Sequence, residues 1–221
     1  MLDLVIENAR ICDGTGAPSR MGTLGAAGGV ITHLGAERGL AARRRVDAGG
    51  LVLAPGFIDP HTHYDAQLFW DPTASPSNLH GVTTVIGGNC GFTIAPLEPR
   101  DADYLRRMMA QVEGMPLETL EAGLPWDWKS FGEYLSRLDG KIGVNAAFMV
   151  GHSAIRRSVM GAEAVGRKAT PEQVGKMVAM LHESLSSGGL GFSTSLSFSH
   201  MDGDGQPVPS RWSDRAEEVM P

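Results

Sequence analysis

The stretch Pro55-Gly56-Phe57-Ile58-Asp59-Pro60-His61-Thr62-His63 marks a change of character in this 221-residue sequence. Before it the chain reads as short strands and glycine-rich turns, and after it apolar strands alternate with helical patterns. Strands that alternate with helices are typical of parallel βα units. We therefore predict a small β module at residues 1–54 and a parallel α/β domain at residues 55–221.

Four segments after Pro55 have the composition of buried parallel strands. They lie at residues 56–59, 82–86, 143–150 and 189–193, and helices are predicted between them at residues 103–112, 131–138 and 171–187. The last helix is the clearest, because Thr170 precedes it as an N-cap, Gln173 follows three residues later and Gly188 comes after its end.

The predicted fold class is α/β, a (β/α)8 TIM-type barrel truncated after about four βα units. A complete barrel of this type has eight βα units and needs about 250 residues. About four units, half of that number, fit after Pro55. Residues 213–220 are predicted to open a further helix just before the last residue, Pro221. We therefore expect residues 55–221 to form the first half of a barrel.

Composition argues against several functional classes. The net charge is -6, and the strongest basic run is Arg43-Arg44-Arg45, which we interpret as a solvated turn between strands. A nucleic-acid partner is not expected, because phosphate binding requires a concentrated cationic face. No stretch reaches the roughly 18 apolar residues of a membrane helix, the N-terminus does not resemble a signal peptide, and only two cysteines are present. These features predict a cytoplasmic protein with no membrane partner.

His61 and His63 directly follow the first predicted strand of the α/β domain. In parallel barrels active sites are built at the carboxyl ends of the strands. Two residues apart on an extended chain, both imidazoles face the same side, as needed to bind one metal ion. Surface or core histidines are the alternative for a bare His-x-His, but the strand before the pair and the flanking Asp59 and Asp65 favour a metal site.

Cys90 directly follows the second predicted strand of the same domain, within Gly88-Asn89-Cys90-Gly91. It is therefore expected at the same edge of the sheet as the two histidines. A lone cysteine is usually a buried packing residue, and this is the prediction for Cys12 in the β module. Flanking glycines let the backbone of Cys90 approach closely, so metal ligation and packing are equally good predictions for this cysteine from the residues alone.

Three further side chains are candidates for the site. Asp65 is expected to orient a ligand histidine or its loop, although a helix or turn cap fits equally well. His152 ends the third predicted strand and is a candidate for a contact with substrate or with a metal ligand. His200 lies after the fourth predicted strand, where it could line the entrance for substrate.

The sequence resembles the D-aminoacylase family (N-acyl-D-amino-acid deacylases) of the amidohydrolase superfamily. The resemblance covers essentially the whole chain and rests on five segments: 5–9, 55–59, 61–63, 81–85 and 88–91. It implies a (β/α)8 barrel beside a small β-sandwich module built from both chain ends. It also implies one or two Zn²⁺ ions, with His61 and His63 binding one position and Cys90 able to bridge to a second.

The same resemblance implies metal-dependent hydrolysis of a linear amide, with a small-molecule N-acyl amino acid as substrate. In the family the tightly held zinc is bound by the cysteine and by two histidines from the fifth and sixth strands, and an aspartate after the eighth strand is the general base. These residues are expected outside this chain, in a missing C-terminal half or a second subunit, so no catalytic residue is assigned. The alternatives are a cyclic amidohydrolase similar to dihydropyrimidinase and a catalytically inert fragment or split subunit.

Overall fold

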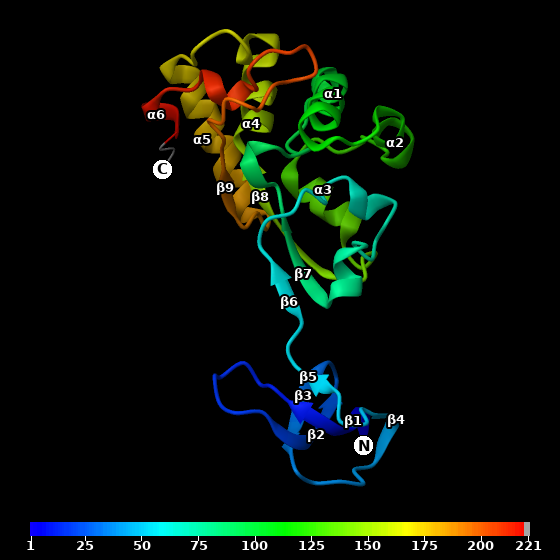
Figure 1. Ribbon diagram of the computed structural model, residues 1–221. Helices are drawn as coiled ribbons and strands as arrows, with labels where there is room; N and C mark the ends of the chain where they lie inside the picture. The colour runs from blue at the N-terminus through cyan, green and yellow to red at the C-terminus, as the bar shows by residue number, and fades with distance from the viewer. Residues whose placement is uncertain (219–221) are drawn as a thin grey trace. The chain divides into compact units, whose positions relative to one another are not determined.

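A computed structural model describes residues 1–218 of the chain. The chain divides into two compact units, of which the first is Met1–Gly56 and the second begins at Phe57 (Figure 1). Among the described residues, no helix has both the length and the apolar character needed to cross a membrane. Each unit has its own sheet, and each is described separately below.

The first unit is a mixed sheet in the order β3-β2-β1-β4, with β5 also pairing with β1. Neighbours β1–β2 and β2–β3 are antiparallel, whereas β4 and β5 run parallel to β1. Val5, Ala9 and Ile11 of β1 are buried. The strands are β1 (Leu2–Ile11), β2 (Arg20–Ala27), β3 (Val30–Gly35), β4 (Ala42–Asp47) and β5 (Val52–Leu53).

The arginine run lies inside a strand, so its interpretation as a turn is wrong. Arg43, Arg44 and Arg45 are exposed residues of β4, at the end of the strand order. Arg45 forms an ion pair with Glu7 of β1, and Arg43 lies 3.7 Å from Asp3. Charged side chains are common on edge strands because they discourage further strand pairing. The run is therefore compatible with a strand at this position.

The second unit contains a curled four-stranded parallel sheet in the order β6-β7-β8-β9 (Figure 1). Its strands are β6 (Phe57–Asp59), β7 (Val82–Gly87), β8 (Asn145–Gly151) and β9 (Gly191–Ser193). All four overlap the predicted strands, which confirms the α/β class. The prediction of a buried first strand is wrong, because Phe57 and Ile58 are 67% and 64% exposed. The physical reason is that β6 is an edge strand, and among the described residues it pairs with β7 alone.

Helices follow the strands of the second unit. Both α3 and α5 begin with a complete capping box, Ser130 with Glu133 and Thr170 with Gln173, as the sequence predicted for α5. The helix α4 directly after β8 was not predicted. The α-helices are α1 (Ala102–Glu113), α2 (Leu117–Gly123), α3 (Phe131–Leu138), α4 (His152–Met160), α5 (Pro171–Ser186) and α6 (Arg215–Glu218). The 3₁₀ helices are η1 (Gln67–Phe69), η2 (Ser77–His80), η3 (Asn89–Gly91), η4 (Pro99–Asp101), η5 (Gly161–Ala164) and η6 (Pro209–Trp212).

The core of this unit is rich in aromatic side chains. Tyr134 lies among Phe69, Trp128, Phe131 and Phe148, with ring centroids 5.2–6.1 Å from its own. The buried polar atoms of two of these rings are satisfied: the Trp128 indole donates to the Ile94 carbonyl, and the Tyr134 hydroxyl donates to the Asp65 carbonyl. The second bond joins the core directly to the segment that follows the His61/His63 pair.

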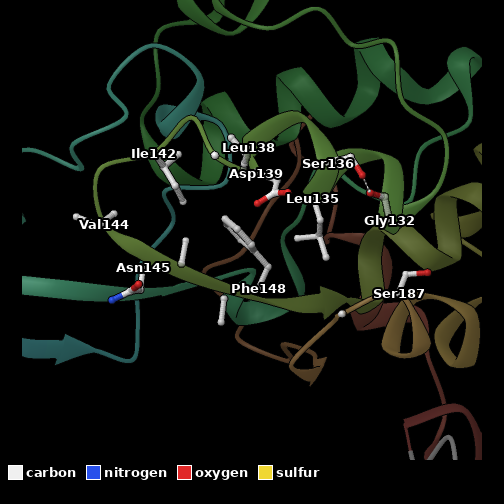
Figure 2. A pocket seen from close by; sticks show the side chains of 14 residues that line it. Gly132, Leu135, Ser136, Leu138, Asp139, Ile142, Val144, Asn145, Phe148 and Ser187 are labelled. Atoms are coloured by element: carbon white, nitrogen blue, oxygen red, sulfur yellow. Dashed lines mark hydrogen bonds between the residues drawn. The ribbon is translucent and has the colours of Figure 1, made fainter. Parts of the chain in front are cut away.

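A hollow of about 500 Å³ opens near the amino end of β8, where α3 and the two residues that follow α5, Ser187 and Gly188, also contribute to its lining. Figure 2 shows Phe148 and Leu135 at its centre, with Asn145 at the start of the strand. This hollow contains none of the candidate site residues, which follow the carboxyl ends of the strands. The two ends of the sheet therefore differ in chemistry, with a hollow of mixed polar and apolar lining at one and clustered histidines at the other.

Candidate metal centre at the carboxyl ends of the strands

Two imidazoles and a thiol meet where β6 and β7 end. One ligand atom from each of His61, His63 and Cys90 can be chosen so that all three lie within 4.8 Å of one another. The His61 Nε2 is 3.4 Å from the Cys90 Sγ, and the two imidazole centroids are 5.4 Å apart. The structure therefore brings together the three residues that the sequence predicted as metal ligands.

Cys90 reaches this position through an unusually tight loop. Gly88, Cys90 and Gly91 all have positive φ, at 73°, 56° and 76°. A Cβ on Gly88 would lie 2.2 Å from the Met149 carbonyl oxygen of β8, so only glycine fits there. Positive φ is uncommon for a residue that carries a Cβ, and such strain is often found at functional sites. The loop therefore turns the Cys90 side chain toward the histidines at a conformational cost.

Hydrogen bonds connect the cysteine loop to the histidine segment. The Asn89 amide donates to the carbonyls of Ile86 and Thr62, at 2.8 and 3.3 Å. The Thr62 backbone N–H and hydroxyl both donate to the Ile86 carbonyl at 2.9 Å. Thr62 stands between the two histidines, so these bonds fix the relative position of the donor groups. No sequence motif had identified Asn89 for this role.

Asp65 is buried and bonds the cysteine loop, with its Oδ2 accepting from the Gly88 N–H at 3.0 Å. Its other carboxyl oxygen, Oδ1, has no hydrogen-bond partner among the described residues. Burial, the largest effect, raises the pKa of Asp65 to about 7. Of the roles proposed from the sequence, the geometry matches orientation of a loop, and it shows no bond from Asp65 to a histidine ring.

The electrostatics of the cluster keep His63 available as a ligand. Burial first, and then the neighbouring His61 and His200, lower the pKa of His63 to about 4. The His63 ring is therefore neutral at pH 7 and has a free lone pair for a metal. Burial raises the pKa of the Cys90 thiol, and the nearby Glu113 carboxylate raises it further. A bound cation would reverse this effect, because metal binding favours the thiolate.

Glu113 is a site residue that sequence reasoning missed. It is the last residue of α1, and its Oε1 lies 3.3 Å from the His63 Nδ1. The two atoms are within ion-pair distance but do not form a hydrogen bond, and the buried His63 Nδ1 has no hydrogen-bond partner among residues 1–218. Burial raises the pKa of Glu113 to about 7. Only the packing of α1 brings this residue to the site, so the local sequence carries no signal for it.

The two other candidate histidines differ in where they lie. His200 lies near the cluster, with its Nδ1 2.7 Å from the Ser195 Oγ and its ring edge-on to Phe92. His152 is fully buried, and its two nitrogens contact Thr194 at 2.9 Å and Glu217 at 2.8 Å. His152 therefore does not join the cluster and its ring is buried between these partners, and its contact with substrate or with a metal ligand stays a prediction.

Comparison with known proteins gives one consistent result. The model of the Amidohydrolase family matches residues 44–220. The D-aminoacylase of Alcaligenes xylosoxydans xylosoxydans is 38% identical over 87% of this chain and 37% of its own length. The N-acyl-D-aspartate deacylase and N-acyl-D-glutamate deacylase of the same organism are 38% and 33% identical over 87% and 89% of this chain. The chain spans about 37% of the length of these curated relatives.

Solved structures agree with the sequence relatives. A D-aminoacylase crystal structure superposes with a TM-score of 0.79 at 33% identity, covering 100% of this chain and 42% of that one. The N-acyl-D-glutamate deacylase of Bordetella bronchiseptica, complexed with zinc and a phosphonate inhibitor, gives 0.78 at 32% identity over 98% of this chain and 41% of that one. The resemblance inferred from the sequence is thereby confirmed, and the chain belongs to the amidohydrolase family.

Proposed function

We propose that His61, His63 and Cys90 bind zinc, and that the chain is the N-terminal part of a metal-dependent amidohydrolase. The observation that carries the proposal is the convergence of two imidazoles and one thiol within 4.8 Å at the carboxyl ends of β6 and β7. Histidine nitrogen and cysteine sulfur are the donors that zinc prefers. A family relative, the B. bronchiseptica deacylase, was crystallised with zinc.

The donor geometry fits the ion. Zn–N and Zn–S bonds of about 2.1 and 2.3 Å at a tetrahedral angle place nitrogen and sulfur about 3.6 Å apart. The His61 Nε2 and Cys90 Sγ are 3.4 Å apart. The buried His63 Nδ1 without a hydrogen-bond partner is a second sign that this cluster is incomplete as a purely protein site. Three donors leave room for one or two ions, if further ligands come from elsewhere.

The reaction we propose is hydrolysis of a linear amide, with N-acyl-D-amino acids as the substrate class. The names of the D-aminoacylase and of the two N-acyl-D-amino-acid deacylases among the relatives support this class. A bound zinc ion activates water and polarises a carbonyl. The residues of this chain hold that centre: the three ligands provide its donors, while Asp65 and Asn89 orient the segments that carry them.

We further propose that β6–β9 form the first half of a (β/α)8 barrel. The relatives are more than twice as long as the matched region, and a barrel of this type needs about 250 residues. The remaining metal ligands and the general base would then lie in a C-terminal half, as a continuation of the chain or as a second subunit. The 221-residue chain alone should therefore bind zinc weakly and show negligible amidase activity.

Cobalt titration tests the metal centre, because Co²⁺ bound by a thiolate gives a charge-transfer absorption band. The wild-type chain should develop this band, and Cys90→Ser should abolish it. The matched control is Cys12→Ser, since Cys12 is the other cysteine and lies in the first unit. His61→Ala should weaken cobalt binding. Unchanged binding in Cys90→Ser would refute the assignment.

The substrate class needs a separate assay. N-acetyl-D-amino acids, their L-enantiomers and a dihydropyrimidine would be offered to the chain alone and to the chain fused to the C-terminal part of the A. xylosoxydans D-aminoacylase. We expect free D-amino acid from the fusion and almost none from the chain alone. Hydrolysis of the cyclic substrate only would replace our proposal with a cyclic amidohydrolase. Full activity of the chain alone, with one tightly bound zinc, would contradict the division into halves.

A further inference from the structure

The hydroxyl of Ser193, the last residue of β9, bonds two backbone groups of the cysteine loop. Its Oγ donates to the Gly88 carbonyl and accepts from the Gly91 N–H at 3.0 Å. Gly88 and Gly91 are the first and last residues of the four-residue loop that contains Cys90. A single hydroxyl therefore spans both ends of the loop, and opening of the loop would break at least one of the two bonds.

The loop needs such support because of its backbone conformation. Cys90 has a φ of 56°, in the left-handed region that a residue with a Cβ adopts only at a cost. Strained conformations of this kind persist only where surrounding contacts determine them. The ends of the neighbouring strands pack closely against the loop and so contribute to this support. A Cβ on Gly91 would lie 3.1 Å from the Thr194 Cα, and a Cβ on Gly151 would lie 2.8 Å from the Gly91 oxygen.

Ser193 and Asp65 act on different atoms of the loop. Asp65 accepts from the Gly88 N–H, whereas Ser193 bonds the Gly88 carbonyl and the Gly91 N–H. Asp65 fixes the entry of the loop from the side of the histidine segment. Ser193 fixes both ends of it from β9, which is separated from β7 by β8 in the sheet order. Without Ser193, Gly88 would be the one loop residue whose backbone still bonds a side chain from the described part of the chain.

We propose that Ser193 is a positioning residue for the metal centre. By bonding the backbone of the cysteine loop, Ser193 holds the Cys90 thiol in place beside His61 and His63. This inference rests on the proposed zinc site. It assigns to β9 a part in the centre, although β9 contributes no ligand to it. The position of the thiol then depends on the end of β9 as well as on its own strand, β7.

The test compares Ser193→Ala with Ser193→Thr, which keeps the hydroxyl and has a side chain suited to a strand. Ser184→Ala is the matched control, because it also removes a hydroxyl that donates to a backbone carbonyl, but within α5. Three quantities are measured: cobalt affinity, the amide exchange rate of Gly91, and the alkylation rate of the Cys90 thiol in a Cys12→Ser background.

Ser193→Ala should weaken cobalt binding about 10- to 100-fold, the usual effect of losing a group that orients metal ligands. It should also speed Gly91 exchange about tenfold, the effect of one lost hydrogen bond, and accelerate alkylation of Cys90. Ser193→Thr should restore all three values. Ser184→Ala should change none of them, even where it lowers the melting temperature.

Two results would overturn the inference. One is wild-type cobalt affinity in Ser193→Ala, because a purely structural hydroxyl would leave the metal centre unchanged. The other is unchanged Gly91 exchange and Cys90 alkylation in that variant, because the hydroxyl would then not hold the loop. A wild-type chain that binds no cobalt refutes the zinc site instead, and the thiol and amide rates still decide whether Ser193 positions Cys90.

Discussion

Replacing Gly88 with alanine should destabilise the second unit far more than the same change at Gly140. Both glycines have a positive φ, 73° at Gly88 and 68° at Gly140. They differ in their surroundings. A Cβ on Gly88 would lie 2.2 Å from the Met149 carbonyl oxygen and 2.9 Å from the Thr93 Cγ2, whereas a Cβ on Gly140 would meet nothing within 4 Å. The pair therefore separates the cost of backbone conformation from the cost of a steric clash.

The magnitudes follow from these two effects. A left-handed conformation costs a residue with a Cβ about 1–2 kcal/mol, and the less flexible unfolded chain returns about 0.4–1 kcal/mol. Gly140→Ala should therefore lower the free energy of unfolding by about 1 kcal/mol. At Gly88 the clash is with the backbone of β8, which cannot rotate away, so overpacking adds about 1–3 kcal/mol. The total for Gly88→Ala is about 2–4 kcal/mol.

Urea unfolding followed by tryptophan fluorescence measures both variants. All four tryptophans lie in the second unit, so the signal reports on that unit alone. Gly88→Ala should also weaken cobalt binding, because relief of the clash with Met149 would displace the loop that carries Cys90, together with the backbone N–H that donates to Asp65. Equal unfolding free energies for the two variants, within about 0.5 kcal/mol, would show that the loop does not pack against β8 as described, since overpacking predicts a larger difference.

Three further changes test other parts of the second unit. Hydrogen bonds from Ser75 are the main cause that lowers the pKa of Asp71. The ionised Asp71 therefore stabilises the fold above the normal carboxyl pKa of about 4, and this stabilisation is lost as the pH falls below that value. The stability gap between wild type and Asp71→Asn should therefore shrink on acidification, and a gap in urea unfolding that is independent of pH would contradict this. Glu217→Ala leaves the fully buried Arg156 without its partner and should cost about 3–5 kcal/mol by the same assay, whereas a neutral result would disprove the ion pair. Thr170→Ala removes the N-cap of α5 and should cost about 1 kcal/mol in thermal unfolding, with no change in cobalt binding.

The features that the sequence predicted well depend on neighbouring residues. The start of α5 follows from Thr170, Gln173 and the proline between them, because capping uses side chains only three residues apart. The strand β7 follows from its run of β-branched residues. The common location of His61 and Cys90 follows from strand direction, because the carboxyl ends of parallel strands meet at one edge of a sheet. The first two inferences need no knowledge of how distant segments pack, and the third needs only that β6 and β7 are parallel neighbours.

The errors and omissions have a different origin. The strand identity of Arg43–Arg45 depends on pairing with β1, some forty residues earlier in the chain. The role of His152 stays a prediction: it follows a strand just as His61 does, but its ring is buried and contacts Glu217 and Thr194. A position after a strand therefore does not establish that a side chain faces the site. Whether such a side chain faces the site depends on the residues from distant segments that pack against it.

By itself, the sequence determined the division of the chain into a β module and an α/β domain, the parallel strands of that domain and the three metal-ligand candidates. The tertiary structure alone decided what surrounds those candidate ligands: Glu113 beside His63, Asp65 on the Gly88 amide, and Ser193 across the cysteine loop. Periodicity, capping and strand direction act over a few residues, so a single sequence records them. The contacts of the supporting residues join segments 23 to 105 positions apart, and only the packing of helices and strands brings such segments together.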